Sequence, residues 1–529
     1  MGLGLYLNPP GNNFAESLRS KIYVDKSELI SHINGMLMTQ QKYVCVSRPR
    51  RFGKTMTASL LNAYYNRSFN SADMFANLKI SNDSSYKEHL NRYDVIYLNI
   101  QDFMSQSKSI KQMIKTINKC ISKDIIEVYP RLKKYVSKIR YTDILDSLFT
   151  FTGIPIVFII DEWDCVFREH KTDVEAQKVY LDYLRTLFKD KSYIALAYMT
   201  GILPIKKYGT HSALNMFREF SMTDPGELSE FVGFTQIEVA KLCYEHQMDY
   251  DEISRWYNGY IFPGITSIYN PKSVVEALLS RCCNDYWSRT ETFEALSYYF
   301  KMNYNGLKDV IIELLSGLKK QINISNFTND MVTFKTYEDI LTLLIHLGYL
   351  GYDSETREVF IPNKEIRDEF VTAIRDTDWG ELVRAIHVSD ALLKAVWKGD
   401  SEAVAQMVEQ AHYETSIIKY NDENSLSCVI SLAFYSAREF YEIRREMPAG
   451  KGFADMSFLP RKNHLDKPAM IVELKWGKSA LEAIQQIESK QYTDILKDYK
   501  GNALLVGINY DKDTKRHECM IKHYYGAVC

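Results

Sequence analysis

The sequence predicts a mixed α/β fold in which a parallel-sheet domain is followed by a helical middle region and a second, smaller α/β domain. Three observations lead to this expectation. Short apolar runs alternate with helical patterns over residues 30–209, the pattern becomes mainly helical over residues 222–412, and strand-like runs return beyond residue 421. Continuous apolar strands separated by helices are typical of a parallel sheet that is covered on both faces.

The length and composition of the chain indicate a packed protein of several domains. A chain of 529 residues is longer than one hydrophobic core normally organises, so we expect three domains, over residues 1–220, 221–410 and 411–529. Hydrophobic residues make up 46% and charged residues 25%, which is typical of a chain that folds throughout. The formal net charge of -2 neither indicates nor excludes binding to nucleic acid.

The cysteines and the longest uncharged segment bear on where the protein acts. The nine cysteines are scattered without a Cys-x-x-Cys pair, which favours reduced thiols over a metal site. The N-terminus has no basic region followed by a long apolar stretch, and the longest uncharged segment, residues 256–271, is too short to span a bilayer. We therefore expect a cytoplasmic protein with no membrane partner, and the sequence leaves its oligomeric state open.

The first domain is expected to contain four buried strands, each followed by a loop or a helix. The apolar runs that predict these strands cover residues 41–47, 95–99, 156–160 and 194–199. Apolar residues at helical spacing predict helices over residues 55–66, 109–129 and 174–188. The two patterns together predict strands and helices that alternate along the chain.

A phosphate-binding motif follows the first of these strands. Residues 48–55 read Arg-Pro-Arg-Arg-Phe-Gly-Lys-Thr, which matches G-x-x-x-x-G-K-[ST] except that Arg48 replaces the first glycine. In such a P-loop, backbone N–H groups surround a phosphate, a lysine contacts the β- and γ-phosphates of ATP, and a hydroxyl binds Mg²⁺. We assign the last two roles to Lys54 and Thr55. The other residues of the expected ATP-binding loop are Arg50, Arg51, Phe52 and Gly53. Since Arg48 does not adopt positive φ as readily as glycine, the front of this loop must be built differently.

A pair of acidic residues ends the third strand. Asp161 at the strand tip can hold Mg²⁺, and Glu162 can orient and deprotonate the water that attacks the γ-phosphate. The alternative is that both residues only cap the start of a helix. Thr200 ends the next strand, where its hydroxyl could contact the γ-phosphate. Together with the P-loop, these residues predict an ATPase.

The middle region includes one segment with a different pattern. Residues 337–370 read as a helix that ends near Gly348, a strand pair joined by a polar turn at residues 353–357, and a second helix. This order suggests a winged-helix unit. Such a unit can contact DNA, but it can equally serve as a lid or as a contact with another protein.

The third domain is expected to be a compact α/β module with a cluster of charged residues. Strand-like segments cover residues 454–459, 469–475 and 503–509, and helical patterns cover residues 426–437 and 479–497. A short polar loop joins the first two strands, so we expect these strands to be adjacent in one sheet.

Asp455 lies on the first of these strands, and Glu473 and Lys475 lie near the end of the second. Because side chains alternate along a strand, Glu473 and Lys475 share one face and can meet Asp455 there. Two carboxylates can bind Mg²⁺, or Mn²⁺ in its place, while the lysine positions a water molecule for phosphodiester hydrolysis. Surface strands often carry similar charges without a function, but the apolar segment at residues 470–472 makes this strand part of the core.

Several segments together resemble a known family. The P-loop, residues 200–208, residues 231–239 and the pair 256–260 and 269–271 are similar to the bacterial AAA-ATPase-like family that is usually fused to a PD-(D/E)xK nuclease superfamily domain. The resemblance covers nearly the whole chain. It implies an ATPase core, a helical region and a C-terminal restriction-endonuclease-like domain.

The resemblance also implies roles for further residues of the third domain. Glu423 matches the acidic metal ligand that this family carries on a helix, and Gln486 followed by Tyr492 matches its next helix, where the amide could fix the nucleophile or a phosphate oxygen. Phe453 departs from the family, which often has arginine at that position. This departure puts a phosphate contact there in doubt and leaves the metal chemistry unaffected.

Two hypotheses of function follow. The first is a protein that binds and hydrolyses ATP and is coupled to a Mg²⁺-dependent nuclease acting on DNA or RNA. The alternative is a nucleotide-dependent switch or scaffold whose nuclease-like domain binds nucleic acid or protein without cleavage. A motor or remodelling protein is a third possibility, for which the sequence has no separate signature.

Overall fold

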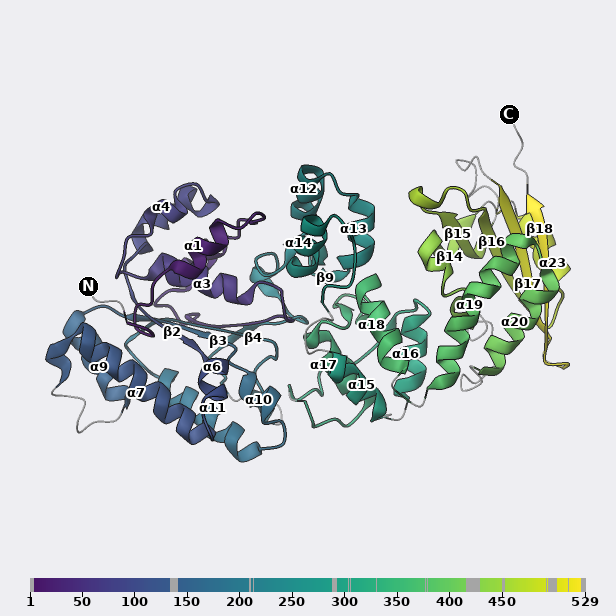
Figure 1. Ribbon diagram of the computed structural model, residues 1–529. Coiled ribbons are helices and arrows are strands. Elements are labelled where there is room, and N and C mark those ends of the chain that lie inside the picture. Colours follow the sequence, from purple (N-terminus) through teal and green to yellow (C-terminus); the bar gives the residue numbers. More distant parts are fainter. Residues whose placement is uncertain are drawn as a thin grey trace. The chain divides into compact units, whose positions relative to one another are not determined.

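A computed structural model of the chain divides it into two compact units, which are described separately (Figure 1). The first unit contains residues 1–291 and 321–367, and the second contains residues 292–320 and 368–529. The structure describes residues 4–133, 141–208, 211–212, 214–287, 293–302, 304, 306–329, 331–375, 377, 379–414, 429–449, 452–490, 492, 502–511 and 513–524. The boundaries of the three domains expected from the sequence remain a prediction.

The first unit is built on a parallel sheet with the strand order β2-β3-β4-β1-β7. Its strands are β1 (Tyr43–Ser47), β2 (Asp94–Asn99), β3 (Ile156–Asp161), β4 (Ile194–Gly201) and β7 (Arg218–Phe220). Every residue of β1, β3 and β4 is buried, as the continuous apolar runs predict. In the register of the sheet, Asp161 lies beside Thr200 and Ser47 lies beside Gly201. The strand ends that carry the acidic pair, Thr200 and the P-loop therefore meet at one edge.

Helices cover both faces of this sheet. Figure 1 shows α1, α3 and α4 on one face and α7, α9 and α11 on the other. The helices of this part are α1 (Asn12–Leu18), α2 (Leu29–Met36), α3 (Lys54–Tyr65), α4 (Ala72–Phe75), α5 (Tyr86–His89), α6 (Ile100–Ser105), α7 (Ile110–Val128), α9 (Tyr141–Thr152), α10 (Cys165–Glu169) and α11 (Val174–Phe188). The short 3₁₀ helices of the whole chain are η1 (Lys79–Asn82), η2 (Pro130–Leu132), η3 (Gly226–Leu228) and η4 (Lys462–His464).

The rest of the first unit contains small sheets and short helices. One sheet has the order β8-β10-β9, a second has the order β11-β13-β12, and β5 pairs with β6. These elements are β5 (Lys207–Tyr208), β6 (His211–Ser212), β8 (Phe234–Thr235), α12 (Gln236–His246), α13 (Tyr250–Tyr257), β9 (Tyr260–Phe262), β10 (Ile265–Tyr269), α14 (Pro271–Ser280), α17 (Tyr337–Leu347), β12 (Gly351–Asp353) and β13 (Glu358–Phe360). Two elements cross the division of the chain: β11 (Lys320–Gln321) begins with a residue of the second unit, and α18 (Lys364–Arg375) continues into the second unit from Asp368. The expected order of helix, hairpin and helix is present from α17 to α18, and a winged-helix role for it remains a prediction.

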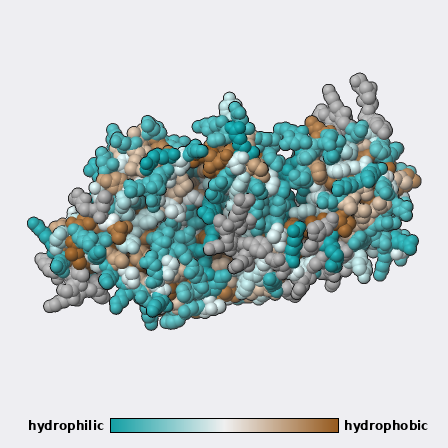
Figure 2. All heavy atoms as spheres, viewed as in Figure 1, coloured by the Kyte–Doolittle hydropathy of each residue, from teal (hydrophilic) through white to brown (hydrophobic). Residues whose placement is uncertain are grey.

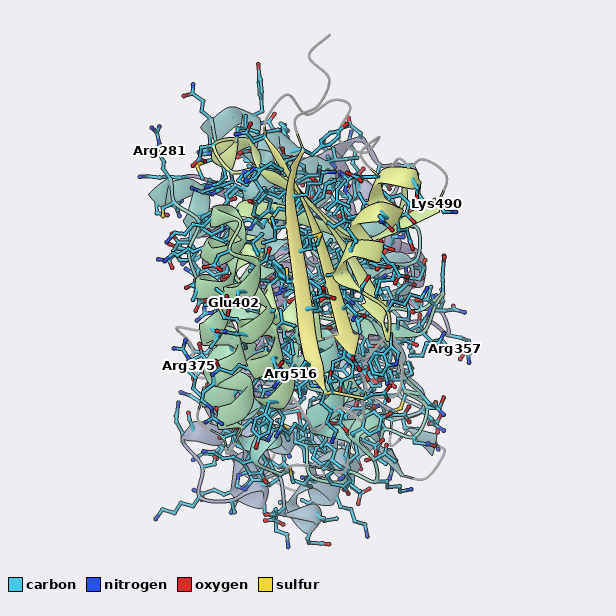
Figure 3. All side chains as sticks on the ribbon, turned by 90° about the vertical axis from the view of Figure 1, so that its right-hand side faces the viewer. Arg281, Arg357, Arg375, Glu402, Lys490 and Arg516 are labelled. Atoms are coloured by element: carbon cyan, nitrogen blue, oxygen red, sulfur yellow. The ribbon has the colours of Figure 1, made fainter. Side chains whose placement is uncertain are left out.

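The second unit has a mixed sheet with the order β14-β15-β16-β17-β18, in which only the β16–β17 pair is parallel. Its elements are α15 (Phe293–Lys301), α16 (Leu307–Leu315), α19 (Gly380–Lys398), α20 (Ser401–Glu414), α22 (Ala437–Phe440), β14 (Tyr441–Ala449), β15 (Gly452–Pro460), β16 (Ala469–Trp476), α23 (Ala480–Ser489), β17 (Ala503–Asp511) and β18 (Arg516–Tyr524). Val396 and Val408 pack against Val472 on one face of the sheet, while Ile484 packs against Ile471 on the other. Figure 3 shows this arrangement, with Glu402 on α20 at one side of the sheet and Lys490 after α23 at the other.

The structure differs from the sequence-based prediction in strands and in one helix. Within the two five-stranded sheets, strands β7, β14 and β18 were not predicted, and the short strands β5, β6, β8, β9, β10 and β11 were not predicted either. The helix expected over residues 426–437 is interrupted, since residues 429–433 are helical and a turn at residues 434–436 precedes α22. A helix was expected over residues 479–497, and α23 ends at Ser489. Most of the residues from 491 to 497 lie outside the described residues.

Figure 2 shows a surface on which hydrophilic side chains prevail and apolar ones form small groups. Among the residues that the structure describes, no helix combines the length and the apolar character needed to cross a membrane.

Candidate functional site

The P-loop between β1 and α3 reverses direction without a glycine at its first position. Arg51 and Gly53 adopt left-handed backbone, with φ of 70° and 95°, whereas Arg48 does not. The buried guanidinium of Arg48 donates to the carbonyl oxygens of Ser47 at 2.9 Å and Phe220 at 3.0 Å. Burial lowers the pKa of Arg48 to about 10. Arg48 therefore joins β1 to β7, and the turn is made further along the loop.

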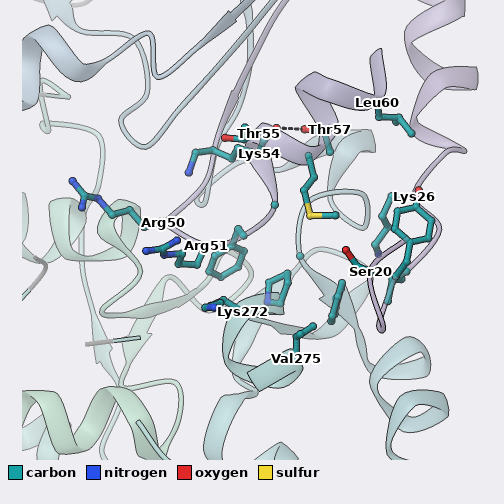
Figure 4. Close-up of a pocket in the computed structure, with 18 of the residues that line it drawn as sticks. Ser20, Lys26, Arg50, Arg51, Lys54, Thr55, Thr57, Leu60, Lys272 and Val275 are labelled. Atoms are coloured by element: carbon teal, nitrogen blue, oxygen red, sulfur yellow. Dashed lines mark hydrogen bonds between the residues drawn. The ribbon is translucent and has the colours of Figure 1, made fainter. Parts of the chain in front are cut away.

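Lys54 lies at the first position of α3, with a side chain that is almost fully buried. Its Nζ donates to the carbonyl oxygen of Pro49 at 2.9 Å, across the P-loop. Burial lowers the pKa of Lys54, and the carboxylates of Glu162 and Asp161 oppose this effect. Figure 4 shows the side chain of Lys54 beside Thr55 in the loop. When a phosphate binds, an ammonium in this place can donate its hydrogen bond to a phosphate oxygen instead of the backbone carbonyl oxygen.

Asp161, at the end of β3, is fully buried. Its Oδ1 accepts from the backbone N–H of Glu162 at 3.0 Å, while its Oδ2 has no hydrogen-bond partner among the described residues. Burial raises the pKa of Asp161 to about 6, and the nearby side chain of Thr55 partly offsets this rise. A buried carboxylate oxygen beside a threonine hydroxyl fits the oxygen ligands that Mg²⁺ requires. The hydroxyl of Thr200, in the next strand, is also buried, and no described residue pairs with it.

Glu162 and its neighbours form a charged network that was not predicted from the sequence. Arg168 on α10 donates from one guanidinium nitrogen to Glu162 Oε2 and from Nε to Asp164 Oδ2 at 3.1 Å. Asp164 Oδ2 also accepts from the backbone N–H groups of Ile202 at 3.1 Å and Leu203 at 2.8 Å. Asp164 thus ties the end of β3 to the loop after β4. The acidic residue two positions after Glu162 and the arginine four positions further were the available signals.

A cleft of about 1070 Å³ opens over the P-loop within the first unit. Arg50, Arg51 and Lys54 line it together with Lys26 and Lys272 (Figure 4). Apolar side chains from the N-terminal segment and from the region of α14 also line the cleft, namely Phe14, Ile22, Val24, Phe234, Val275 and Leu279. Basic groups suit phosphates, and an apolar wall suits a purine base. This wall, Lys26 and Lys272 could not be predicted from the sequence, because their positions lie far from the P-loop in the chain.

In the second unit, the structure brings four of the expected site residues together. Asp455 on β15 accepts from the backbone N–H of Leu474 at 2.7 Å, so it lies next to the end of β16. Glu473 Oε1 accepts from Lys475 Nζ at 2.8 Å and also from the side-chain amide of Gln486 on α23. The same amide of Gln486 donates to the hydroxyl of Tyr492 at 3.2 Å.

The electrostatics of Glu473 set this cluster apart from a solvated surface patch. Its side chain is 1% exposed. Burial, with the charge of Asp455, raises the pKa of Glu473 to about 7 despite the hydrogen bond from Lys475. Its Oε2 is buried, and none of the described side chains or backbone groups pairs with it. Two neighbouring carboxylates with an unpaired oxygen fit a divalent cation. Glu423 lies outside the described residues, and no group of three or more potential metal ligands occurs within them.

Comparisons with known proteins support the two-part organisation. A family described as a predicted AAA-ATPase matches residues 12–210, and the PD-(D/E)XK nuclease superfamily matches residues 421–519. A protein of Azotobacter chroococcum mcd 1, described as an uncharacterized protein in the vnfD 5'region, is 24% identical over 530 residues, which cover 93% of each chain.

Two solved structures show much lower similarity. The ORC2 protein of Aeropyrum pernix, solved with ADPNP and ADP, has 12% identity and a TM-score of 0.30 over 68% of this chain and 96% of its own. PCH-2 of C. elegans has 14% identity and a TM-score of 0.21 over 48% of this chain and 53% of its own. These scores are too low to support an argument about function. From the two family matches, the chain carries a predicted AAA-ATPase domain over residues 12–210 and a PD-(D/E)XK nuclease superfamily domain over residues 421–519.

Proposed function

We propose that this chain binds and hydrolyses ATP in the cleft of its first unit and cleaves phosphodiester bonds of nucleic acid at a Mg²⁺-dependent site in its second unit. The observation that carries the nuclease proposal is the buried carboxylate of Glu473, which lies beside Asp455 and accepts hydrogen bonds from Lys475 and Gln486. A purely structural cluster would gain little from burying the carboxylate of Glu473 beside a second acidic group.

In the ATP site, each group has a separate task. The backbone of residues 50–53 surrounds the phosphates, and Lys54 moves from the Pro49 carbonyl to the β- and γ-phosphate oxygens. Thr55 and Asp161 hold Mg²⁺, which neutralises charge on the phosphates when it is bound. Glu162 accepts a proton from the attacking water. The Thr200 hydroxyl donates to the γ-phosphate.

At the nuclease site, Asp455 and Glu473 would hold Mg²⁺ or Mn²⁺, with Glu423 as the further ligand that the family resemblance implies. A cation held there would supply Lewis-acid polarisation of the scissile phosphate. Lys475 positions the attacking water, whose oxygen bonds to phosphorus as the bond to the leaving oxygen breaks. Gln486 orients Glu473 through its amide. A positive charge next to the reacting phosphate also stabilises the additional negative charge of the transition state.

The direct test is incubation of the purified full chain with labelled single- and double-stranded DNA and RNA, with Mg²⁺ or Mn²⁺, with and without ATP. Cleavage that needs the metal and is lost in Asp455→Ala is expected. ATP hydrolysis, measured in parallel, should fall by roughly 10² to 10⁴ in Glu162→Gln while ATP still binds. Binding of nucleic acid without cleavage of any substrate would favour the alternative, a nucleotide-dependent switch or scaffold.

A further inference from the structure

One guanidinium group joins the two carboxylates on either side of Trp163. Arg168 contacts Glu162 through one terminal nitrogen and Asp164 through Nε. The side chain of Arg168 is 10% exposed, that of Glu162 is 25% exposed and that of Asp164 is fully buried. Because this network is largely shielded from water, its attractions are stronger than those of an ordinary surface ion pair.

Asp164 holds one side of this network in place. Its carboxylate accepts hydrogen bonds from two backbone N–H groups of the loop after β4, and it packs closely against Gly201. A Cβ added to Gly201 would lie 2.5 Å from Asp164 Oδ1 and 2.7 Å from the ring of Trp163. Arg168 is therefore anchored through Asp164 to the strand end that carries Thr200.

Glu162 is the less constrained partner. It is the more exposed of the two carboxylates, and it lines the nucleotide cleft together with Lys54 and Arg168. Its backbone has φ of 53°, a left-handed conformation that residues with a Cβ rarely adopt. Its carboxylate contacts Arg168, whereas a base for ATP hydrolysis must contact a water beside the γ-phosphate.

We propose that Arg168 is a positioning residue that holds Glu162 in a resting position, so that ATP hydrolysis requires this ion pair to open. This inference rests on the proposed function, in which Glu162 is the base. Asp164 is bonded to the loop after Thr200, so a shift of that loop when Thr200 meets the γ-phosphate moves Arg168 relative to Glu162. The ion pair thereby links the state of the nucleotide to the position of the base.

The test is steady-state ATP hydrolysis by the full chain with Arg168→Ala, Arg168→Lys, Glu162→Gln and the double variant Glu162→Gln/Arg168→Ala. Arg168→Ala is expected to raise kcat roughly three- to tenfold and to change KM by less than about twofold. Arg168→Lys should give a smaller rise, because one ammonium cannot bridge both carboxylates as a guanidinium does. In the Glu162→Gln background, Arg168→Ala should have no further effect.

Arg185→Ala is the matched control. Arg185 pairs with Asp182 at 2.8 Å on an exposed part of α11, outside the cleft, and its loss should leave kcat at the parental value. Thermal unfolding of every variant shows whether it is folded. If Arg168→Ala does not fold, Arg168→Lys carries the test, with a raised kcat expected.

The possible failures can be told apart. A fall in kcat in folded Arg168→Ala, or an unchanged kcat, overturns the resting-position inference even if Glu162→Gln is as slow as expected. An increase in KM that persists in the Glu162→Gln background would show that Arg168 contacts the nucleotide instead. If Glu162→Gln hydrolyses ATP as fast as the parent, the assignment of the base in the proposed function is what fails.

Discussion

Three buried charged residues mark the two candidate sites. Lys54, Asp161 and Glu473 are each no more than 5% exposed. Burial lowers the pKa of Lys54, raises that of Asp161 to about 6 and raises that of Glu473 to about 7. Such groups are costly to keep charged unless an opposite charge joins them. A phosphate at Lys54 and a cation at the two acids would supply those charges.

Replacing Lys54 by Ala should weaken ATP binding by roughly 10² or more, because the charge-assisted hydrogen bonds to the β- and γ-phosphates are lost in a largely enclosed site. Isothermal titration with a non-hydrolysable ATP analogue measures the change. Lys79→Ala, which removes an exposed lysine paired with Glu28, should bind as the parent does. Equal affinity in Lys54→Ala and the parent would contradict the placement of the nucleotide.

At the nuclease site, replacing the acidic residue Asp455 and replacing the basic residue Lys475 should affect metal binding differently. Asp455→Ala and Lys475→Ala should each reduce cleavage by at least about 10², while ATP binding stays intact. Asp455→Ala removes a metal ligand and should weaken Mn²⁺ binding, whereas Lys475→Ala removes a nearby positive charge and should leave Mn²⁺ affinity equal or slightly higher. Calorimetry with Mn²⁺ separates the two, and equal effects on metal affinity would indicate a general charged patch.

At the scale of elements, one glycine controls a close approach inside the first unit. Gly259 precedes β9 with φ of 117°, and a Cβ there would lie 2.1 Å from the carbonyl oxygen of Pro362, after β13. Gly259→Ala should lower the free energy of unfolding by about 3 kcal/mol or more. Gly264→Ala is the control, since Gly264 has φ of 75° but no atom near its Cβ position, and should cost about 1 kcal/mol. Urea unfolding measures the free energy of unfolding of both variants. Equal losses would mean that the backbone at Pro362 moves aside at little energetic cost.

A histidine pair joins α20 to β18 in the second unit. His412 Nδ1 lies 3.0 Å from His517 Nε2. Burial lowers the pKa of both to about 4, with the charge of His517 as a further cause for His412. The unfolded chain binds protons near pH 6.5 and the folded pair only near pH 4, so stability is present above about pH 6.5 and falls as the pH drops toward 4.

The melting temperature of the second unit should therefore fall by roughly 5 °C or more between about pH 7 and pH 4.5. The double variant His412→Gln/His517→Gln should show a smaller fall, and His523→Gln, at an exposed histidine, should behave as the parent. Differential scanning calorimetry provides the measurement. An identical pH dependence in the double variant would exclude the pair as its source.

The sequence predicts the inner strands well and the edge strands poorly. Strands β1, β3 and β4 are largely apolar runs, and β16 begins with one, because both of their faces are covered. The three strands that were missed in the two five-stranded sheets, β7, β14 and β18, lie at the edges of these sheets. An edge strand needs fewer apolar side chains, so its sequence is harder to distinguish from a loop.

The same reasoning explains which site residues could be foreseen. Asp455, Glu473 and Lys475 lie on two consecutive strands, so alternation of side chains was enough to place them on one face. The contact of Arg168 with Glu162 and the apolar wall of the cleft depend on how loops and helices pack. Sequence spacing does not determine such packing.

For the whole molecule, the folding unit is larger than the segment that matches the nuclease superfamily. That segment starts at residue 421, after α19 and α20. Leu392, Val396, Val404 and Val408 from these helices share a core with the sheet. The apolar face of the sheet would be exposed without them.

A fragment of residues 421–529 should therefore be unfolded or aggregated, whereas residues 368–529 should unfold cooperatively. Far-ultraviolet circular dichroism and thermal unfolding of the two fragments test this expectation. A cooperative transition in the shorter fragment would show that α19 and α20 are dispensable for the core.

The division of the chain between the units also affects the order in which its parts can fold during synthesis. The carbonyl oxygen of Ser316, at the end of α16, accepts from Arg438 and Arg445, which follow it by 122 and 129 residues. At a translation rate of roughly 5 to 20 residues per second, α16 leaves the ribosome roughly 6 to 24 s before these partners. The Ser316 carbonyl therefore stays without these two arginines for that time, and the end of α16 reaches its final hydrogen bonding only after β14 has been made.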